Sequence, residues 1–445
     1  MNILSITTQK PHSTGSGTYL TELVRAWDRS GHRQAVVAGI YRSDEVLFPA
    51  SVRFLLVLFT APGEAPADIP FPVTGMSDIM PYPSTRYSDL TEETIRQLEQ
   101  AFVPVVRRAI RELQPDLILC HHLFLLTAIL RKHFPEERIC GLSHGSDLRQ
   151  MHNLLTGGAG YRTQAIDPAF VQDQIRDLDR VFALHEAQAE RIRELYRVPE
   201  ERITVIGTGY NAQIFYPPKE RAQEAGRPYR VVYAGKLSRE KGVPELIRAA
   251  GQLDASPDVP PIELHLCGGC QDAEVKRLLG ADPDAPLAAG TFRWQQGRLH
   301  FSTTEDAGGT GSCVRYHGAV PQTKLAEIFR QSDLFILPSY YEGLPLVLIE
   351  AMACGLDTVC TDLPGVRPWI TGAVPGCNTR FVPLPEMQSI DVPAPSALPA
   401  FVSALADAVR AAMRDRSASG TCGDLPDTSG ASWDAVAARF LEAVR

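Results

Sequence analysis

The chain has 445 residues, of which 44% are hydrophobic and 22% are charged, as is typical of a soluble globular protein. Because a single hydrophobic core stops growing at about 250–300 residues, this length predicts two domains. The 44 Lys and Arg residues against 52 Asp and Glu residues give a net charge of −8, which argues against nucleic acid as the main partner.

The N-terminal residues MNILSITTQ show no cationic stretch followed by an apolar core, so we expect no signal peptide. The longest apolar run, FLLVLF at 54–59, is far shorter than the ~18 residues of a spanning helix. Nine scattered cysteines fit free thiols in a reducing cytoplasm better than a disulfide framework. Cys267 and Cys270 form a C-x-x-C pair without a second pair or a nearby His, so we expect no metal site there.

Short apolar runs alternate with segments of helical period in the first half of the chain. The strands expected are NILSIT (2–7), QAVVAGI (34–40) and DLILCHH (116–122), and the helices expected are 17–31, ending at Gly31, and 94–115. This rhythm is typical of parallel sheets with helices on both faces, and it brings ligand sites to the C-terminal ends of the strands. We therefore predict an α/β fold.

The rhythm restarts at YRVVYAGKLS (229–238), after a polar stretch rich in Pro and Gly, so we place a domain boundary near 215–226. The expected division is an N-terminal domain 1–216, a C-terminal domain 217–430 and a final helix 431–445 capped by Ser432. Two such doubly wound, Rossmann-like domains would face a central cleft. Residues 281–312 and 372–398 are rich in Gly, Pro and small residues, and we interpret both as surface-loop insertions.

The stretch SYYEGLPLVLIEAMACG (339–355) predicts a turn and a short buried helix, with Pro345 at its first position and Gly355 just past its end. Glu350 lies in the middle of the apolar run, and burying an unpaired carboxylate costs several kcal/mol. Hydrogen bonds from the hydroxyls of a bound polyol to Glu342 and Glu350 would offset that cost. The alternative is that Glu342 only favours the positive helix end and that Glu350 pairs with a buried Arg.

Three further patterns point to ligand binding. Lys236 and Lys241 bracket the loop between a strand and a helix opened by Pro244, which suits an anion the size of a diphosphate, although two surface lysines often have no such role. Gly15 and Gly17 allow close approach of the backbone to a ligand. His144 and Asp147 follow a short strand, where a structural role is the alternative.

Together these motifs resemble the retaining glycosyltransferases of family 4, which have the two-Rossmann (GT-B) architecture. EGLPLVLIEAMACG resembles the E-x7-E signature of the family, and GKLSREKGVPELIRA resembles its phosphate loop. Weaker similarity covers the N-terminal glycine loop GSGTYLTELVRAWDRSGH, the turn SHGSD, the interdomain crossing VIGTGYNAQIFYP and the final helix. The resemblance thus extends over the whole length.

The resemblance implies roles for particular residues. Glu342 and His144 would contact the donor sugar, Glu350 the ribose, and Lys236 and Lys241 the diphosphate. Further contacts to the nucleotide sugar are implied for Gly15, Gly17, Val320, Gly343 and Leu344.

The resemblance also implies a reaction. The enzyme would be a retaining, hexosyltransferase-type glycosyltransferase that needs no metal or cofactor. It would take a nucleotide sugar, expected to be a UDP-sugar, in the C-terminal domain. A glycan or glycolipid acceptor would bind in the N-terminal domain.

Other functions fit the residues less well. An NAD-dependent dehydrogenase would need G-x-G-x-x-G directly after the first strand, but Leu20 stands at the third glycine position. A metal-dependent transferase would need D-x-D at a strand end, and the candidates at 177–179 and 282–284 lie elsewhere. A sugar-nucleotide epimerase of the same architecture and a non-catalytic nucleotide-sugar-binding protein stay open.

Contact with a membrane is a further open alternative. The helix within 94–113 carries Arg107, Arg108 and Arg111 beside apolar residues, as in a helix that lies in a membrane interface. We favour a solvated outer face over a core stripe. The expected location is the cytoplasm, with peripheral contact at the inner face of the membrane as the alternative.

Overall fold

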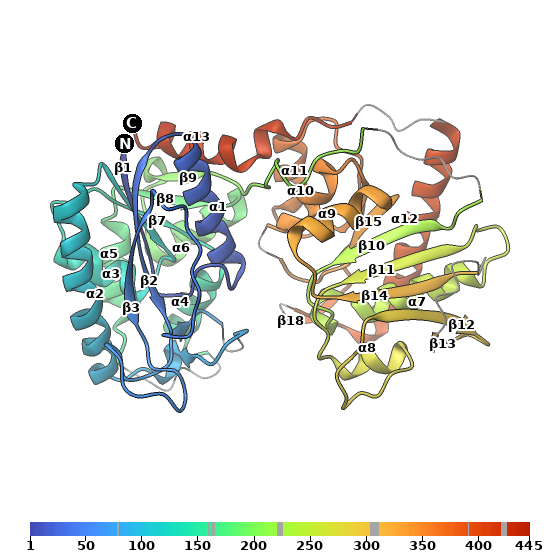
Figure 1. Cartoon of the computed structure of the whole chain (residues 1–445), viewed down its shortest axis with the longest axis horizontal. Coiled ribbons are helices and arrows are strands. Elements are labelled where there is room, and N and C mark those ends of the chain that lie inside the picture. Colours follow the sequence, from blue (N-terminus) through green and yellow to red (C-terminus); the bar gives the residue numbers. More distant parts are fainter. Residues whose placement is uncertain are drawn as a thin grey trace. The chain divides into compact units, whose positions relative to one another are not determined.

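The computed structural model describes residues 1–77, 80–158, 161, 165–219, 226–302, 311–342, 344–389, 391–419 and 425–445 (Figure 1). The chain divides into two compact units. Unit 1 comprises Met1–Gly209 and Trp433–Arg445, and unit 2 comprises Tyr210–Ser432. These limits differ from the expected 216/217 and 430/431. At these limits Tyr210 donates its backbone N–H to the Ala431 carbonyl at 3.1 Å, so the two connecting segments lie side by side.

Unit 1 is built on a seven-stranded sheet in the order β3-β2-β1-β6-β7-β8-β9, with every pair parallel. The strands are β1 (Asn2–Thr7), β2 (Arg33–Ile40), β3 (Arg53–Leu58), β6 (Leu117–His121), β7 (Ile139–Leu142), β8 (Arg180–Ala183) and β9 (Ile203–Val205), with a separate pair β4 (Thr74–Gly75) and β5 (Thr85–Arg86). The strand order reverses between β1 and β6, which is where doubly wound sheets bind ligands.

Helices cover both faces of this sheet. They are α1 (Gly15–Arg29), α2 (Glu92–Leu113), α3 (Leu125–His133), α4 (Ser146–Thr156), α5 (Pro168–Arg176), α6 (Glu186–Tyr196) and α13 (Trp433–Ala443). Val36 and Ala38 of β2 pack against α1, whereas Ala35 and Val37 pack in the cluster that includes α2. Because successive strand residues point to opposite faces, α1 and α2 lie on opposite sides of the sheet.

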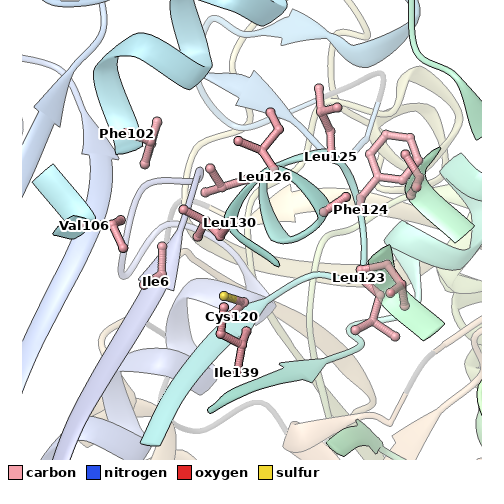
Figure 2. Close-up of a cluster of buried hydrophobic side chains, with 14 of the residues drawn as sticks. Ile6, Phe102, Val106, Cys120, Leu123, Phe124, Leu125, Leu126, Leu130 and Ile139 are labelled. Carbon is pink, nitrogen blue, oxygen red and sulfur yellow. The ribbon is translucent and has the colours of Figure 1, made fainter. Parts of the chain in front are cut away.

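The core under α2 and α3 shows how the expected helices are held. Figure 2 shows Phe102 and Val106 of α2, Ile6 of β1 and Leu130 of α3 pointing toward one another. Thr91 and Thr94 form a reciprocal capping box that starts α2, and α2 ends at Leu113, two residues before the expected end. The order of apolar and polar residues therefore predicted this helix well.

The final helix α13 belongs to unit 1 although it is distant in sequence. It lies beside α1 (Figure 1), and the Trp27 indole N–H donates to the Ala437 carbonyl at 3.2 Å. The rings of Tyr19 and Trp433 meet edge to face at 4.7 Å. The chain therefore returns to unit 1 after unit 2 is complete.

Unit 2 contains an eight-stranded sheet in the order β13-β12-β14-β11-β10-β15-β16-β17. The strands are β10 (Tyr229–Ala234), β11 (Ile262–Cys267), β12 (Gly290–Gln295), β13 (Arg298–Ser302), β14 (Cys313–Gly318), β15 (Leu334–Leu337), β16 (Asp357–Thr361) and β17 (Thr379–Val382). Six of them, β14 to β17 in that spatial order, are parallel. The strand order reverses between β10 and β15, so a ligand crevice is expected outside the ends of these two strands.

The helices of unit 2 are α7 (Val243–Asp254), α8 (Ala273–Leu278), α9 (Gln322–Gln331), α10 (Leu346–Ala353), α11 (Val366–Ala373) and α12 (Leu398–Ser419). The stretch Pro395–Arg416, which includes most of α12, is long and apolar enough to cross a membrane by length and composition. It instead packs on α7, β16 and β17, with buried Phe401, Leu405 and Val409. We therefore interpret α12 as a core helix of unit 2.

The interpretation of 281–312 and 372–398 as loop insertions was wrong in part. The first contains the hairpin β12–β13, which adds two antiparallel strands to the edge of the sheet. Gln296 and Gly297 both have positive φ, as in a tight hairpin turn, and Phe292 and Leu299 are buried. The second contains β17 and the small hairpin β18 (Met387–Ser389) with β19 (Val392–Pro393). Residues 303–310 and 390 lie outside the described part of the chain.

Eight cysteines lie among the described residues, and all are free thiols. In the C-x-x-C pair, burial raises the pKa of the Cys267 thiol to about 12 and also raises that of Cys270. A reactive thiol is favoured by a lowered pKa, so the raised values suit structural thiols, with Cys267 buried and Cys270 partly exposed.

Candidate functional site at the reversal of strand order

The loop that follows β10 carries the two lysines predicted to bind an anion. A short 3-10 helix, η3 (Arg239–Lys241), leads through Gly242 into α7. Gly242 has φ +64°, and a Cβ there would lie 2.1 Å from the Pro338 carbonyl oxygen, so glycine is required. Lys241 is half-buried just before α7, whereas Lys236 is exposed and its carbonyl accepts a hydrogen bond from the Tyr233 hydroxyl at 2.8 Å.

The loop that follows β15 carries Glu342 to the same place. The Lys241 Nζ lies 2.8 Å from the Glu342 Oε1 and also donates to the Tyr341 carbonyl at 3.3 Å. The Ser339 hydroxyl donates to the same Glu342 oxygen at 2.8 Å. The structure therefore brings together one predicted cation and one predicted carboxylate, and adds a serine that the sequence did not single out.

A buried polar cluster fixes this second loop to α7. The Tyr340 hydroxyl donates to the Glu245 Oε2 at 2.7 Å, and the other Glu245 oxygen lies 2.7 Å from the Arg248 Nη1. The Tyr340 backbone N–H donates to the Glu240 carbonyl at 3.2 Å. Burial and the Glu245 charge raise the pKa of Tyr340 far above its usual value, so it stays a hydrogen-bond donor.

Glu350 lies inside α10 and is only 8% exposed. Helix α10 is almost wholly buried, and Gly355 follows it with φ +77°, as expected for the residue past a helix end. Pro345 is the cap that precedes the helix, with an extended ψ of 99°, and is not its first helical residue as expected. A carboxylate is thus held about one turn into an apolar helix, in the segment that follows Glu342.

The remaining predicted residues of unit 2 lie around these loops. Leu344 is buried before α10, and Val320 is half-buried between β14 and α9. Gly343 lies outside the described residues. No group of three or more His, Cys, Asp or Glu side chains in the described part of the chain is placed to hold a metal ion.

In unit 1, the two glycines of the first loop have different surroundings. A Cβ on Gly17 would lie 2.9 Å from the Lys10 carbonyl oxygen, so Gly17 lets the chain pack on itself. A Cβ on Gly15 would meet nothing within 4 Å, which leaves space beside the N-terminus of α1. The geometry therefore favours a structural reason for Gly17 and keeps Gly15 available to a ligand.

His144 follows β7 and stacks on a second histidine at the end of β6. The His144 Nε2 lies 3.0 Å from the His121 Nδ1, and the rings are 12° from parallel. Burial, together with the neighbouring His122 and His121, lowers the pKa of His144 well below its usual value. A neutral imidazole is therefore present at pH 7. Asp147 accepts from the Leu123 backbone N–H at 2.7 Å, so it serves to hold the loop.

The histidine stack predicts a pH dependence of stability. Burial lowers the pKa of His121 from 6.5 to about 3, with His122 as the second cause. Between these values the unfolded chain binds a proton that the folded domain does not, so the free energy of unfolding falls as the pH falls. His121 alone contributes a slope of about 1.4 kcal/mol per pH unit.

We expect urea unfolding of the wild type to show this loss between about pH 6.5 and pH 5. His121→Gln should make the dependence shallower, whereas His300→Gln, at an exposed residue of unit 2, should not. An unchanged slope in the His121 variant would show that the imidazole is not kept neutral by the fold.

Several buried polar atoms at the same edge of unit 1 have no partner among the described residues. They are the Gln9 Nε2, the His121 Nε2 and both ring nitrogens of His122. Gln9 follows β1, and the histidines end β6, so they lie at the reversal of strand order of this sheet. Buried polar groups are normally hydrogen-bonded, so this edge is suited to a ligand with hydroxyl groups. Sequence reasoning missed Gln9 and the pair 121–122, although their positions at strand ends were a usable signal.

Family models match most of the chain. The model "Glycosyltransferase Family 4" matches residues 13–214, and the model "Glycosyl transferases group 1" matches residues 218–382. The D-inositol 3-phosphate glycosyltransferase of Thermobispora bispora is 30% identical over 213 residues, 46% of this chain and 45% of that relative. The alpha-maltose-1-phosphate synthase of Mycolicibacterium smegmatis is 25% identical, over 47% of this chain and 49% of that relative. The matched stretch thus spans about half the length of these relatives.

Two solved structures cover nearly the whole chain. Sucrose-phosphate synthase from Thermosynechococcus elongatus has a TM-score of 0.64 at 19% identity, over 99% of this chain and 97% of that one. The Anabaena protein Alr3699/HepE, solved with UDP and glucose, has a TM-score of 0.57 at 15% identity, over 100% and 99%. At these identities the similarity shows a shared two-domain α/β fold.

Proposed function

Because the chain belongs to the glycosyltransferases of family 4 with the GT-B architecture, we propose that it transfers a sugar from a nucleotide sugar to an acceptor hydroxyl. The observation that carries this proposal is the meeting of Lys241 and Glu342, from two different loops, at the reversal of strand order in unit 2. The donor binds in unit 2 and the acceptor in unit 1.

Lys241 serves the diphosphate in this proposal. Its present partner is the Glu342 carboxylate, at 2.8 Å. A diphosphate carries more negative charge than a carboxylate, so it draws the ammonium group away and frees Glu342. As the bond between the sugar and the diphosphate breaks, the leaving group gains charge. Lys241, the exposed Lys236 and the N-terminus of α7 then stabilise the transition state more than the ground state.

Glu342 and Glu350 serve the hydroxyl groups of the donor. Once Lys241 has moved to the diphosphate, Glu342 accepts hydrogen bonds from the sugar next to the reacting carbon. The Ser339 hydroxyl holds the Glu342 carboxylate in position, and the hydrogen bond from Tyr340 to Glu245 holds the loop that carries it. Glu350, deeper in α10, accepts from the ribose, with Val320 near the base and Leu344 beside the nucleotide. Gly343, in the same E-x7-E stretch, is a further proposed contact to the nucleotide sugar.

His144 and Gly15 of unit 1 are the proposed contacts to the donor from the other domain. A neutral His144 both donates and accepts a hydrogen bond, which suits a sugar hydroxyl. Gly17, whose missing side chain lets the loop pack against the Lys10 carbonyl, supports the position of Gly15. The unpartnered polar atoms at the ends of β1 and β6 support a glycan or glycolipid acceptor, because such an acceptor supplies the missing hydroxyl partners.

The finer features of the reaction are part of the proposal. It proceeds with retention of configuration and without a metal ion. The donor is a UDP-sugar, which is supported by the UDP and glucose in the similar Anabaena structure. The location is cytoplasmic. On α2, the Arg107 guanidinium lies 5.1 Å from the Phe134 ring centroid and Arg108 pairs with Glu112 at 3.0 Å, so both arginines already have partners in the protein. Peripheral contact of this helix with a membrane is the alternative.

A panel of nucleotide sugars tests the proposal. The matching donor is expected to raise the melting temperature of the protein through binding to the folded state, and then to be hydrolysed slowly or transferred. Activity should persist in EDTA, and the anomeric configuration of the product reports retention. If conversion of the donor to another nucleotide sugar occurs without an acceptor, the chain is an epimerase. If binding occurs without turnover, the chain is a binding protein.

Lys241→Ala tests the role of the cation separately. Losing a charge-assisted contact of about 1.5–3 kcal/mol is expected to weaken nucleoside diphosphate binding by about 10- to 150-fold in a calorimetric titration. Lys324→Ala is the matched control, because Lys324 is exposed on α9 and pairs with Glu327 at 2.9 Å, outside the proposed diphosphate site. Equal affinity in both variants would remove Lys241 from the diphosphate site.

A further inference from the structure

A cavity of about 680 Å³ borders the loop that carries η3. Its walls come from η3, from α7, from the hairpin β18–β19 and from the start of α12. Tyr340 also lines it, but Lys241, Glu342 and Glu350 do not. The volume is that of a small-molecule site, and no role proposed above uses it.

The charges around this cavity do not balance. Two guanidinium groups and four carboxylates line it, and both guanidiniums are already paired. Arg239 lies 2.6 Å from Glu274, and Arg248 pairs with both Glu245 and Glu274. Glu240 and Asp391 carry the excess negative charge among the residues that line the cavity, and the pKa of Glu240 is lowered by a hydrogen bond from Ser238 and by the nearby Lys236 outside the cavity. The Asp391 side chain forms no ion pair or hydrogen bond with any other residue that the structure describes.

Part of the cavity wall is apolar and partly open to water. Val392 is 47% exposed, and it lies beside Pro393, Leu398 and Val402 on the cavity wall. Covering apolar surface of this kind is favourable because it removes that surface from water. A ligand that fits must therefore combine an apolar body with a group that suits two carboxylates.

We propose that this cavity binds a small organic cation, in which an ammonium group faces Glu240 and Asp391 and an apolar body covers Val392 and Leu398. The two arginines do not select an anion, because their charge is neutralised by Glu245 and Glu274. This site is independent of the proposed sugar transfer and stands whether or not that proposal holds.

A charge series of matched probes tests the proposal by calorimetric titration of the whole chain. The probes are 4-phenylbutylamine, 4-phenylbutan-1-ol and 4-phenylbutyrate, which differ in charge but share the apolar body. We expect the amine to bind, the alcohol to bind at least about tenfold more weakly, and the carboxylate not to bind. Equal affinities for all three, or tightest binding of the carboxylate, would overturn the proposal, as would no binding of the amine at millimolar concentration.

Variants place the binding in this cavity. Glu240→Gln and Asp391→Asn should each weaken the amine about fivefold and leave the alcohol unchanged, because each removes one partly exposed ion pair. Leu398→Trp should fill the cavity and abolish binding of both. Asp254→Asn is the control, at an exposed carboxylate of the same helix α7 outside this cavity. Unchanged amine binding in all three cavity variants would show that the probe binds elsewhere.

Discussion

Replacing Glu342 with alanine is expected to lower the kcat of sugar transfer by about 100-fold or more. In the proposed reaction the carboxylate accepts hydrogen bonds from donor hydroxyls next to the reacting carbon. Each bond to a charged group contributes about 1.5–3 kcal/mol, and 1.4 kcal/mol corresponds to a factor of ten. The affinity for the nucleoside diphosphate should stay the same or increase, since Lys241 is released from its ion pair of 2.8 Å. Initial rates and calorimetric titration measure the two effects separately.

The matched control for this variant is Asp407→Ala. Asp407 is an exposed carboxylate of α12 that pairs with Arg410 at 2.8 Å, so it removes a charge from unit 2 without touching the site. A kcat within about threefold of the wild type for Glu342→Ala would show that Glu342 takes no part in the chemical step. A loss of nucleotide affinity as large as that of Lys241→Ala would instead assign Glu342 to the binding loop alone.

The proximity of Lys241 and Glu342 could be predicted from the sequence for a physical reason. Each follows a short apolar strand, and the C-terminal ends of parallel strands lie along one edge of a sheet. Strands β10 and β15 turned out to be neighbours, so the two loops meet. Hydrophobic periodicity and glycine positions likewise predicted α1, α2 and α10 to within a few residues.

The contacts that fix these loops could not be predicted in the same way. Tyr340 and Glu245 are 95 residues apart, and neither residue type in its local pattern signals a partner. From the sequence, Lys236 and Lys241 were assigned the same role. In the structure Lys236 is exposed, whereas Lys241 lies beside Glu342. The hairpin β12–β13 was missed because its small flanking residues suggested a loop, although its turn at 296–297 was a hairpin signal.

Replacing Gly242 with alanine is expected to destabilise unit 2 by about 3 kcal/mol or more, among the larger effects of a single substitution. Two causes act together. Gly242 has φ +64°, a conformation that costs a residue with a side chain about 1–2 kcal/mol. The new Cβ would also lie 2.1 Å from the Pro338 carbonyl oxygen and 2.9 Å from its carbon, which is inside van der Waals contact.

Gly376→Ala separates these two causes, because Gly376 has φ +76° and a Cβ there would meet nothing within 4 Å. It should therefore show the backbone cost alone in urea unfolding. The extra loss at Gly242 measures the close approach of the loop after β10 to the loop after β15. Since Lys241 and Glu342 sit on these two loops, forcing them apart should also weaken nucleoside diphosphate binding, which the Gly376 variant should leave intact. If both variants unfold at the same urea concentration and bind the nucleotide equally, the close contact between the two loops is not what holds the site together.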